Sequence, residues 1–182
     1  MSGFVLGVLK KVKYENIPMT NYAYDYEQYW TTHFTCQEPH EQEANILIDF
    51  LKQFKFYSVL ELGSGQGHLS KKLKENFNCH LTGLDLISGN KYLDYFIMKN
   101  VCDFKPDGVY DLIITRNFLM HIKPTDINQV LFNLIRKSKH FVAVEYYPDQ
   151  KGNQTLADHN FAHPYKGLTV KQINPERAIL WV

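Results

Sequence analysis

The chain has 182 residues, a length typical of one domain with a sizeable hydrophobic core. Its 20 basic and 19 acidic residues give a formal net charge of +1, so the charge balance favours no nucleic-acid partner. The three cysteines have no CxxC spacing, which argues against a disulfide framework and against a zinc site. We therefore expect an intracellular, cytoplasmic protein without a bound metal.

Residues 1–40 are expected to form an N-terminal arm ahead of the core. The apolar run Phe4–Leu9 is far shorter than the roughly 20 residues of a membrane-spanning helix. Its lysines follow the run, whereas a signal peptide carries its positive charge first. We expect a strand, a helix or a frayed arm here, with a membrane-surface helix as the less favoured alternative.

Residues 41–182 are expected to form a single core in which helices alternate with strands. Apolar side chains at helical spacing predict helices over residues 40–54, 68–77 and 125–138, the last with Thr125 or Asp126 as N-cap. Short apolar runs with little alternation predict the strands of a parallel sheet that is covered on both faces, at 57–62, 79–86, 96–101, 110–116 and 140–147.

The end of the chain has a different pattern. Two β-prone runs, 168–173 and 177–182, are separated only by Asn174-Pro175-Glu176, which predicts an antiparallel hairpin. Such a hairpin is unusual for a nicotinamide-binding domain. Residues 87–95 are ambiguous, with a short helix as one option.

A glycine-rich turn follows the first core strand, with the sequence Glu61-Leu62-Gly63-Ser64-Gly65-Gln66-Gly67. Glycines allow positive φ and a close approach of the backbone to a ligand. The spacing G-x-G-x-G differs from the dinucleotide fingerprint G-x-G-x-x-G, and no G-K-[ST] follows that would indicate a triphosphate loop. A carboxylate at Glu61 would repel a pyrophosphate and attract an ammonium group.

The pattern E-x-G-x-G-x-G after a strand resembles motif I of the class I S-adenosylmethionine (SAM)-dependent methyltransferases. This resemblance implies a Rossmann-like α/β fold with a seven-stranded, mostly parallel sheet of order 3-2-1-4-5-7-6 and an antiparallel C-terminal hairpin. It also implies SAM as the cofactor. The residues expected to bind it are Glu61, Gly63, Ser64, Gly65, Gly67, Asp85, Leu86, Asp103, Phe104, Arg116 and Asn117.

Specific roles follow from the same resemblance. Asp85, at the end of the second strand, corresponds to the acid that binds the ribose hydroxyls, and Asp103, after the third, to the group that meets the adenine amine. The segment Thr115-Arg116-Asn117 corresponds to motif IV beside the methyl group. Alone, Asp85 could equally be a helix cap and Asp103 a turn residue.

A narrower resemblance is carried by "TRNFLMHIKPTDINQVLFNLIRKSKHFVAVEYY", residues 115–147. It is similar to methyltransferase-like proteins associated with pseudaminic acid and other sugar biosynthesis, which implies a sugar-derived acceptor as one option. The chain departs from these proteins downstream, because residues 148–167 lack the arginine-bearing basic loop of that group.

Two side chains are candidate catalytic bases for an oxygen or nitrogen acceptor that must lose a proton: His121 and Glu145. A packing role for His121 and a structural or substrate-orienting role for Glu145 are the alternatives. We expect an aromatic lid over the donor or substrate, facing a second wall formed by residues 146–167. An aromatic satellite core is the alternative for the expected lid residues, which are Tyr24, Tyr26, Tyr29, Trp30 and His33. His159 and His163 are four residues apart, but a zinc site would need further ligands.

The predicted function is methyl transfer from SAM to an oxygen or nitrogen of a small molecule. The sequence after the fourth strand, "TRNFLMHI", does not match the D/N-P-P-Y signature of enzymes that methylate base amines. Two alternatives stay open: a catalytically inactive SAM-binding sensor or partner subunit, and an enzyme that cleaves SAM itself. The acceptor and the oligomeric state are not specified by the sequence.

Overall fold

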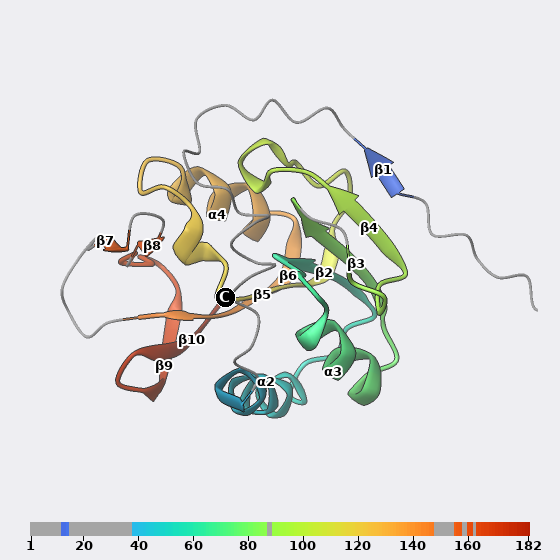
Figure 1. Ribbon diagram of the computed structural model, residues 1–182, viewed down its shortest axis with the longest axis horizontal. Coiled ribbons are helices and arrows are strands. Elements are labelled where there is room, and N and C mark those ends of the chain that lie inside the picture. The colour runs from blue at the N-terminus through green and yellow to red at the C-terminus, as the bar shows by residue number, and fades with distance from the viewer. Residues whose placement is uncertain (1–11, 15–37, 87–88, 148–154, 158–159, 162) are drawn as a thin grey trace, which may run out of the picture.

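The computed structural model describes residues 12–14, 38–86, 89–147, 155–157, 160–161 and 163–182. Its centre is one eight-stranded sheet (Figure 1). The strands of this sheet are β1 (Val12–Tyr14), β2 (Ser58–Leu62), β3 (His80–Asp85), β4 (Tyr95–Met98), β5 (Tyr110–Arg116), β6 (Ser138–Tyr146), β9 (Thr169–Asn174) and β10 (Arg177–Trp181).

The strand order is β1-β4-β3-β2-β5-β6-β10-β9. Strand β10 runs antiparallel to both β6 and β9, and the other pairs are parallel. The seven strands from β4 to β9 reproduce the order 3-2-1-4-5-7-6, which confirms the predicted Rossmann-like fold and its closing hairpin. The added strand β1 pairs with β4 at the edge of the sheet.

Helices cover both faces of the sheet. Figure 1 shows α2 (Glu38–Leu51) and α3 (His68–Asn76) on one face and α4 (Ile127–Ile135) on the other. Two hydrophobic clusters follow this division, because successive side chains of a strand point to opposite faces. In β6, for example, Phe141 and Ala143 pack with the α4 cluster, whereas Val142 and Val144 pack with the α2–α3 cluster.

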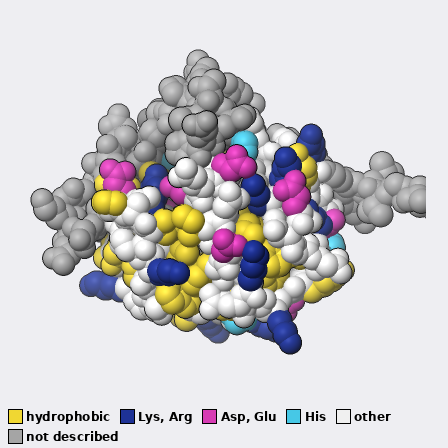
Figure 2. All heavy atoms as spheres, turned by 90° about the horizontal axis from the view of Figure 1, so that it is seen from below, with side chains coloured by type: hydrophobic (Ala, Val, Ile, Leu, Met, Phe, Trp, Pro, Cys, Tyr) yellow, Lys and Arg dark blue, Asp and Glu magenta, His cyan; other side chains and the backbone are white. Residues whose placement is uncertain are grey.

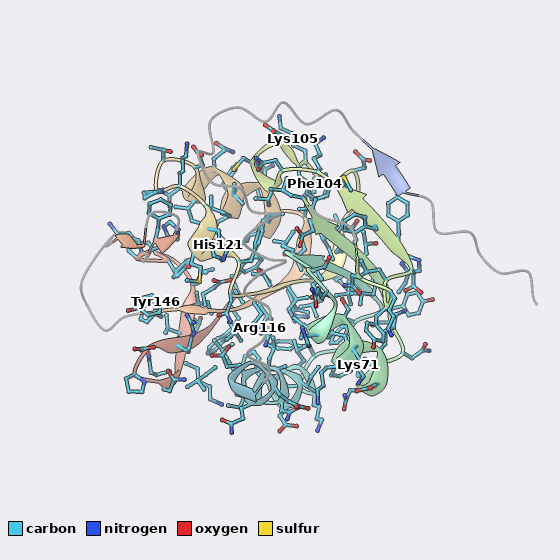
Figure 3. All side chains as sticks on the ribbon, viewed as in Figure 1. Lys71, Phe104, Lys105, Arg116, His121 and Tyr146 are labelled. Carbon is cyan, nitrogen blue, oxygen red and sulfur yellow. The ribbon has the colours of Figure 1, made fainter. Side chains whose placement is uncertain are left out.

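This alternation also assigns the polar side chains to faces. Glu61 is two residues after Val59 in β2, and Arg116 is two residues after Ile114 in β5. Both side chains therefore lie on the α2–α3 face, where Val59 and Ile114 pack. Glu145 is two residues after Ala143 in β6, so its side chain lies on the α4 face. Figure 3 shows the same arrangement, with Arg116 toward α2 and His121 on its α4 side.

The bounds of most strands agree closely with those predicted from the sequence, whereas other elements agree less well. The fourth core strand has the predicted bounds, 110–116, whereas the third is shorter and is followed by a 3-10 turn, η1 (Val101–Asp103). Asp126 occupies the N-cap of α4, but its side chain makes no capping hydrogen bond and instead accepts one from Thr125.

The segment 146–167 contains secondary structure that the sequence pattern did not reveal. Two short strands, β7 (Thr155–Ala157) and β8 (Asn160–Phe161), form an antiparallel ribbon. Strand β8 contacts a second 3-10 turn, η2 (Leu119–His121), which follows β5. Among the described residues, no helix is long and apolar enough to cross a membrane.

Candidate active site

The candidate site lies where the parallel strands β2, β3, β5 and β6 end. Open α/β sheets bind ligands at this carboxyl edge, because the loops that leave the strands diverge there. The glycine turn follows β2, Asp85 ends β3, Arg116 ends β5 and Glu145 lies near the end of β6. The predicted residues of four different segments therefore belong to one edge of the sheet.

The three glycines of the turn all have positive φ, at 64°, 46° and 90° for Gly63, Gly65 and Gly67. A Cβ on Gly63 would lie 2.3 Å from the ring of Phe118, and one on Gly67 would lie 2.2 Å from Oδ1 of Asn90. Among the described residues, a Cβ on Gly65 would meet nothing nearer than 4.0 Å. The outer two glycines thus make room for protein side chains, and within this part of the chain Gly65 is the one that faces open space.

A buried hydrogen-bond network supports the turn from behind. Ser70 of α3 donates a short hydrogen bond from Oγ to Oε2 of Glu61. The Asn90 amide donates to the Ser64 carbonyl at 3.2 Å and to Ser70 Oγ at 2.6 Å. Sequence reasoning missed Ser70 and Asn90. Ser70 carried no signal beyond a place in the predicted helix, and Asn90 lies in the ambiguous segment 87–95.

Glu61 is 3% exposed, and burial raises the pKa of its carboxyl group to about 8. The hydrogen bond from Ser70 and the charge of Arg116 act in the opposite direction but are weaker than the desolvation. A buried carboxylate that is not fully compensated favours a cationic partner. This fits the ammonium group that the sequence predicted for the ligand.

Asp85 connects the second strand to the glycine turn. Its Oδ2 accepts the Gly65 N–H at 2.7 Å, and its Oδ1 accepts the Leu86 N–H at 2.7 Å. A carboxylate oxygen can accept more than one hydrogen bond, which is compatible with the ribose-binding role expected of Asp85. Two further residues predicted to bind the cofactor follow the third core strand, β4. Asp103 is exposed on η1, whereas Phe104 is buried in the core.

The chain bends sharply after β5. Asn117 has a φ of 54°, a left-handed conformation that asparagine tolerates better than most residues, and its N–H bonds to the Val144 carbonyl at 2.8 Å. The bend places Phe118 against Gly63. The motif IV segment and the glycine turn are therefore in direct contact.

Glu43 of α2 joins two segments that are distant in sequence. Its Oε2 accepts a hydrogen bond from Nδ2 of Asn117 at 3.2 Å, and its Oε1 pairs with Nε of Arg177 at 3.3 Å. Arg177 begins β10, and its guanidinium lies 5.4 Å from the ring centre of Tyr146. Sequence reasoning missed Glu43 and Arg177, because only the packing of α2 against the end of the sheet brings them together.

Both candidate catalytic residues lie around η2. Glu145 is fully buried, and its Oε1 accepts the N–H groups of Phe118 and Leu119, each at 3.1 Å. Burial raises the pKa of Glu145 to about 7. His121 is the last residue of η2 and is half-buried, and Nε2 of His163 donates to the Leu119 carbonyl at 3.1 Å. Glu145 and His163 thus hold η2 from two sides.

The predicted lid lies outside the described residues, as does His159, so the structure does not place them. The lid residues are Tyr24, Tyr26, Tyr29, Trp30 and His33. Within the part of the chain that is described, no group of three or more His, Cys, Asp or Glu side chains is arranged to hold a metal ion.

The family of the chain follows from comparison with known proteins. A family model described as a methyltransferase domain matches residues 36–169. The chain belongs to this methyltransferase family. Membership confirms the resemblance to the class I SAM-dependent enzymes and, with it, the predicted methyl donor. No curated protein matches the sequence.

Solved structures share the fold of this methyltransferase at low sequence identity. The DhpI–SAM–HEP complex matches with a TM-score of 0.61 and 14% identity, over 85% of this chain and 94% of that chain. A Burkholderia thailandensis 1,6-didemethyltoxoflavin-N1-methyltransferase with bound S-adenosylhomocysteine also reaches 0.61 and 14%, over 85% and 80%. The magnesium protoporphyrin IX methyltransferase ChlM from Synechocystis PCC 6803 reaches 0.56 and 16%, over 78% and 82%.

The geometry at the carboxyl edge of the sheet fits a bound SAM molecule. Within the described residues, Gly65 leaves open space in front of the turn, Glu61 supplies a buried carboxyl group, and the Asp85 carboxylate holds the Gly65 N–H. The described outer surface over α2 and α3 carries both acidic and basic side chains (Figure 2).

Proposed function

We propose that this methyltransferase transfers the SAM methyl group to an oxygen or nitrogen of a small molecule. The observation that carries the proposal is the buried Glu61 carboxyl group beneath an open glycine turn, at the same edge as Asp85. The small-molecule ligands named for two neighbours, HEP and 1,6-didemethyltoxoflavin, support an acceptor of that size. A sugar-derived acceptor stays one option within this class.

Each residue on the donor side has a role in this proposal. Glu61 pairs with the ammonium group of the donor, Asp85 accepts from its ribose hydroxyls, and Asp103 lies on the loop expected to meet the adenine. When bound, SAM supplies an electrophilic methyl group on a sulfonium. The protein then contributes mainly alignment, because a well-oriented nucleophile gains several kcal/mol toward the barrier, up to about 7–11 kcal/mol in the best cases.

The two candidate bases, His121 and Glu145, have different roles in this proposal. His121 is the residue that could take a proton from a hydroxyl or amine acceptor, because η2 presents it at the end of the motif IV segment. Glu145 acts as a positioning residue, because its Oε1 is committed to the backbone of η2. The lid, the second wall and a cytoplasmic location stay predictions.

Calorimetry on the full chain tests the donor site directly. We expect SAM and S-adenosylhomocysteine to bind, and Glu61→Gln to weaken the binding roughly 100-fold, whereas Glu75→Gln on the exposed side of α3 leaves it unchanged. A labelled-donor assay on small-molecule pools then tests transfer. Binding without turnover would favour a sensor, and donor loss without a methylated product would favour SAM cleavage. Failure to bind either ligand would overturn the proposal.

A further inference from the structure

The Glu43 side chain of α2 is 13% exposed and uses its two carboxylate oxygens on two different segments. Oε2 accepts a hydrogen bond from Nδ2 of Asn117 at 3.2 Å, and Oε1 pairs with Nε of Arg177 at 3.3 Å. The guanidinium of Arg177 also lies over the ring of Tyr146, at 5.4 Å from its centre. Arg177 is two residues before Ile179 in β10, so its side chain lies on the α2–α3 face, as Glu43 does.

This bridge determines which way the Asn117 amide faces. A carboxylate that is ion-paired with an arginine can only accept hydrogen bonds, so the amide must present its NH2 group to Oε2 of Glu43. The amide oxygen, Oδ1, then lies on the other side of the amide. It is buried and has no hydrogen-bond partner among the described residues. Because buried carbonyl oxygens are rarely left without a donor, Oδ1 is suited to a ligand.

The backbone places this oxygen at the carboxyl edge of the sheet. Asn117 directly follows β5 with a φ of 54°, and its N–H donates to the Val144 carbonyl at 2.8 Å. The next residue, Phe118, packs against Gly63 of the glycine turn. The amide therefore lies between α2 and the turn, in the region where Figure 3 labels Arg116. Open α/β sheets bind their ligands at this edge.

We propose that Glu43 is a positioning residue, which orients the Asn117 amide so that Oδ1 accepts a hydrogen bond from a proton-bearing nitrogen or oxygen of a bound ligand. This inference rests on the proposed function and adds a requirement to it, because the group that meets Asn117 must carry an N–H or O–H. Two ligands of the reaction can supply such a group. They are the ammonium of SAM and a hydroxyl or amine of the methyl acceptor.

The isosteric variant Glu43→Gln tests the orientation of the amide. The remaining side-chain oxygen should face Arg177, because a guanidinium has only donors, and the new NH2 group should then face Asn117. The Asn117 amide would turn over to accept from it, so a donor instead of an acceptor would face the ligand. We expect roughly a tenfold loss in affinity or turnover for the ligand that meets Asn117.

Exchanging the acid and the amide should reverse this loss. In the double variant Glu43→Gln with Asn117→Asp, the new amide donates to one oxygen of the new carboxylate, and the second oxygen again accepts from the ligand. We expect most of the loss to be recovered, whereas Asn117→Asp alone places two carboxylates in contact and stays impaired. A bridge that only ties α2 to β10 predicts no recovery, because both Glu43→Gln proteins have the same contact with Arg177.

Two readouts on the full chain identify the ligand that donates to Asn117. Calorimetry measures the affinity for SAM and S-adenosylhomocysteine, and a labelled-donor assay on pools of small alcohols and amines measures KM and kcat. Loss and recovery of donor affinity assign the ammonium group. Loss and recovery of KM or kcat at unchanged donor affinity assign the methyl acceptor. Glu41→Gln is the matched control, because Glu41 lies on the same helix and pairs with Lys72 at 3.0 Å on the exposed side.

The side-chain amide signal of Asn117 in a nitrogen–proton NMR spectrum provides a direct check. Asn117→Gly assigns the signal, since glycine tolerates the positive φ and removes the amide. We expect the signal to shift when S-adenosylhomocysteine, or this product together with a methylated pool member, is added. Melting temperatures verify that each variant folds.

Three results would overturn the proposal. They are an Asn117 signal that no added ligand shifts, a Glu43→Gln protein with wild-type donor affinity and turnover, and an exchange variant that recovers neither. If the wild type binds neither SAM nor S-adenosylhomocysteine, the proposed function fails first, and calorimetry recognises that failure before any variant is compared.

Discussion

The donor side and the acceptor side of this methyltransferase are built differently. On the proposed donor side, hydrogen bonds through Ser70 and Asn90 support the turn after β2, although the buried Ser64 hydroxyl has no partner among the described residues. On the proposed acceptor side, Glu43 joins Asn117 to Arg177, and Glu145 binds the backbone of η2. The donor side is thus held together by segments that follow one another in the chain, whereas the acceptor side also depends on the distant helix α2.

The largest effect is expected at Glu61. Glu61→Gln should weaken SAM binding by about 3 kcal/mol or more, which is roughly 100-fold, because a buried ammonium loses its counter-ion. Without ligand the same variant should be more stable than the wild type at pH 8, because it no longer has a buried group to ionise. Calorimetry and urea unfolding measure the two effects. Equal SAM affinity in the two proteins would show that the ammonium is bound elsewhere.

The glycine turn offers a second contrast. Gly63→Ala should cost about 2–4 kcal/mol of folding free energy, because its Cβ would overlap the Phe118 ring at positive φ. Gly65→Ala should cost only about 1–2 kcal/mol of stability, the strain of its backbone, and should lower SAM affinity more than stability. Unfolding and binding titrations separate the two. Similar stability losses at both positions would contradict the assignment of Gly65 as the open position.

On the acceptor side, Glu145→Ala should destabilise the protein by about 2–3 kcal/mol, because the N–H groups of Phe118 and Leu119 lose their acceptor. SAM affinity should change less than turnover, since η2 lies beyond the donor turn. Glu145→Gln keeps an oxygen acceptor and serves as the control, with most of the stability retained. Greater damage to SAM binding than to turnover would move Glu145 to the donor side.

The smallest predicted effect is a pH dependence confined to the donor side. The folded-state pKa of Glu61 is about 8, above the ordinary value of 4.5, so ligand-free stability should fall as pH rises between these values. Since SAM favours the ionised carboxylate, its affinity should rise roughly tenfold from pH 7 to pH 8.5, with proton release on binding. Calorimetry in buffers of different ionisation enthalpy measures this proton. A pH dependence that persists in Glu61→Gln would assign it to another group.

The two sides also differ in how far the sequence could predict them. Glu61, the glycines and Asp85 follow successive strands at recognisable spacing, and the structure brings them to one edge as expected. The role of Phe118 and Asn90 in requiring Gly63 and Gly67 was not foreseen, because those contacts cross between loops. The predicted lid and His159 lie outside the described residues and stay predictions.

The sequence by itself determined the alternating strands and helices, the closing hairpin and the class of methyl donor, because these depend on hydrophobic periodicity and on residues close together in the chain. Only the tertiary structure decided that Glu145 supports η2 and that Glu43 joins Asn117 to Arg177. Such features depend on desolvation and on contacts between segments that are far apart in the chain, and no local pattern in the sequence encodes them.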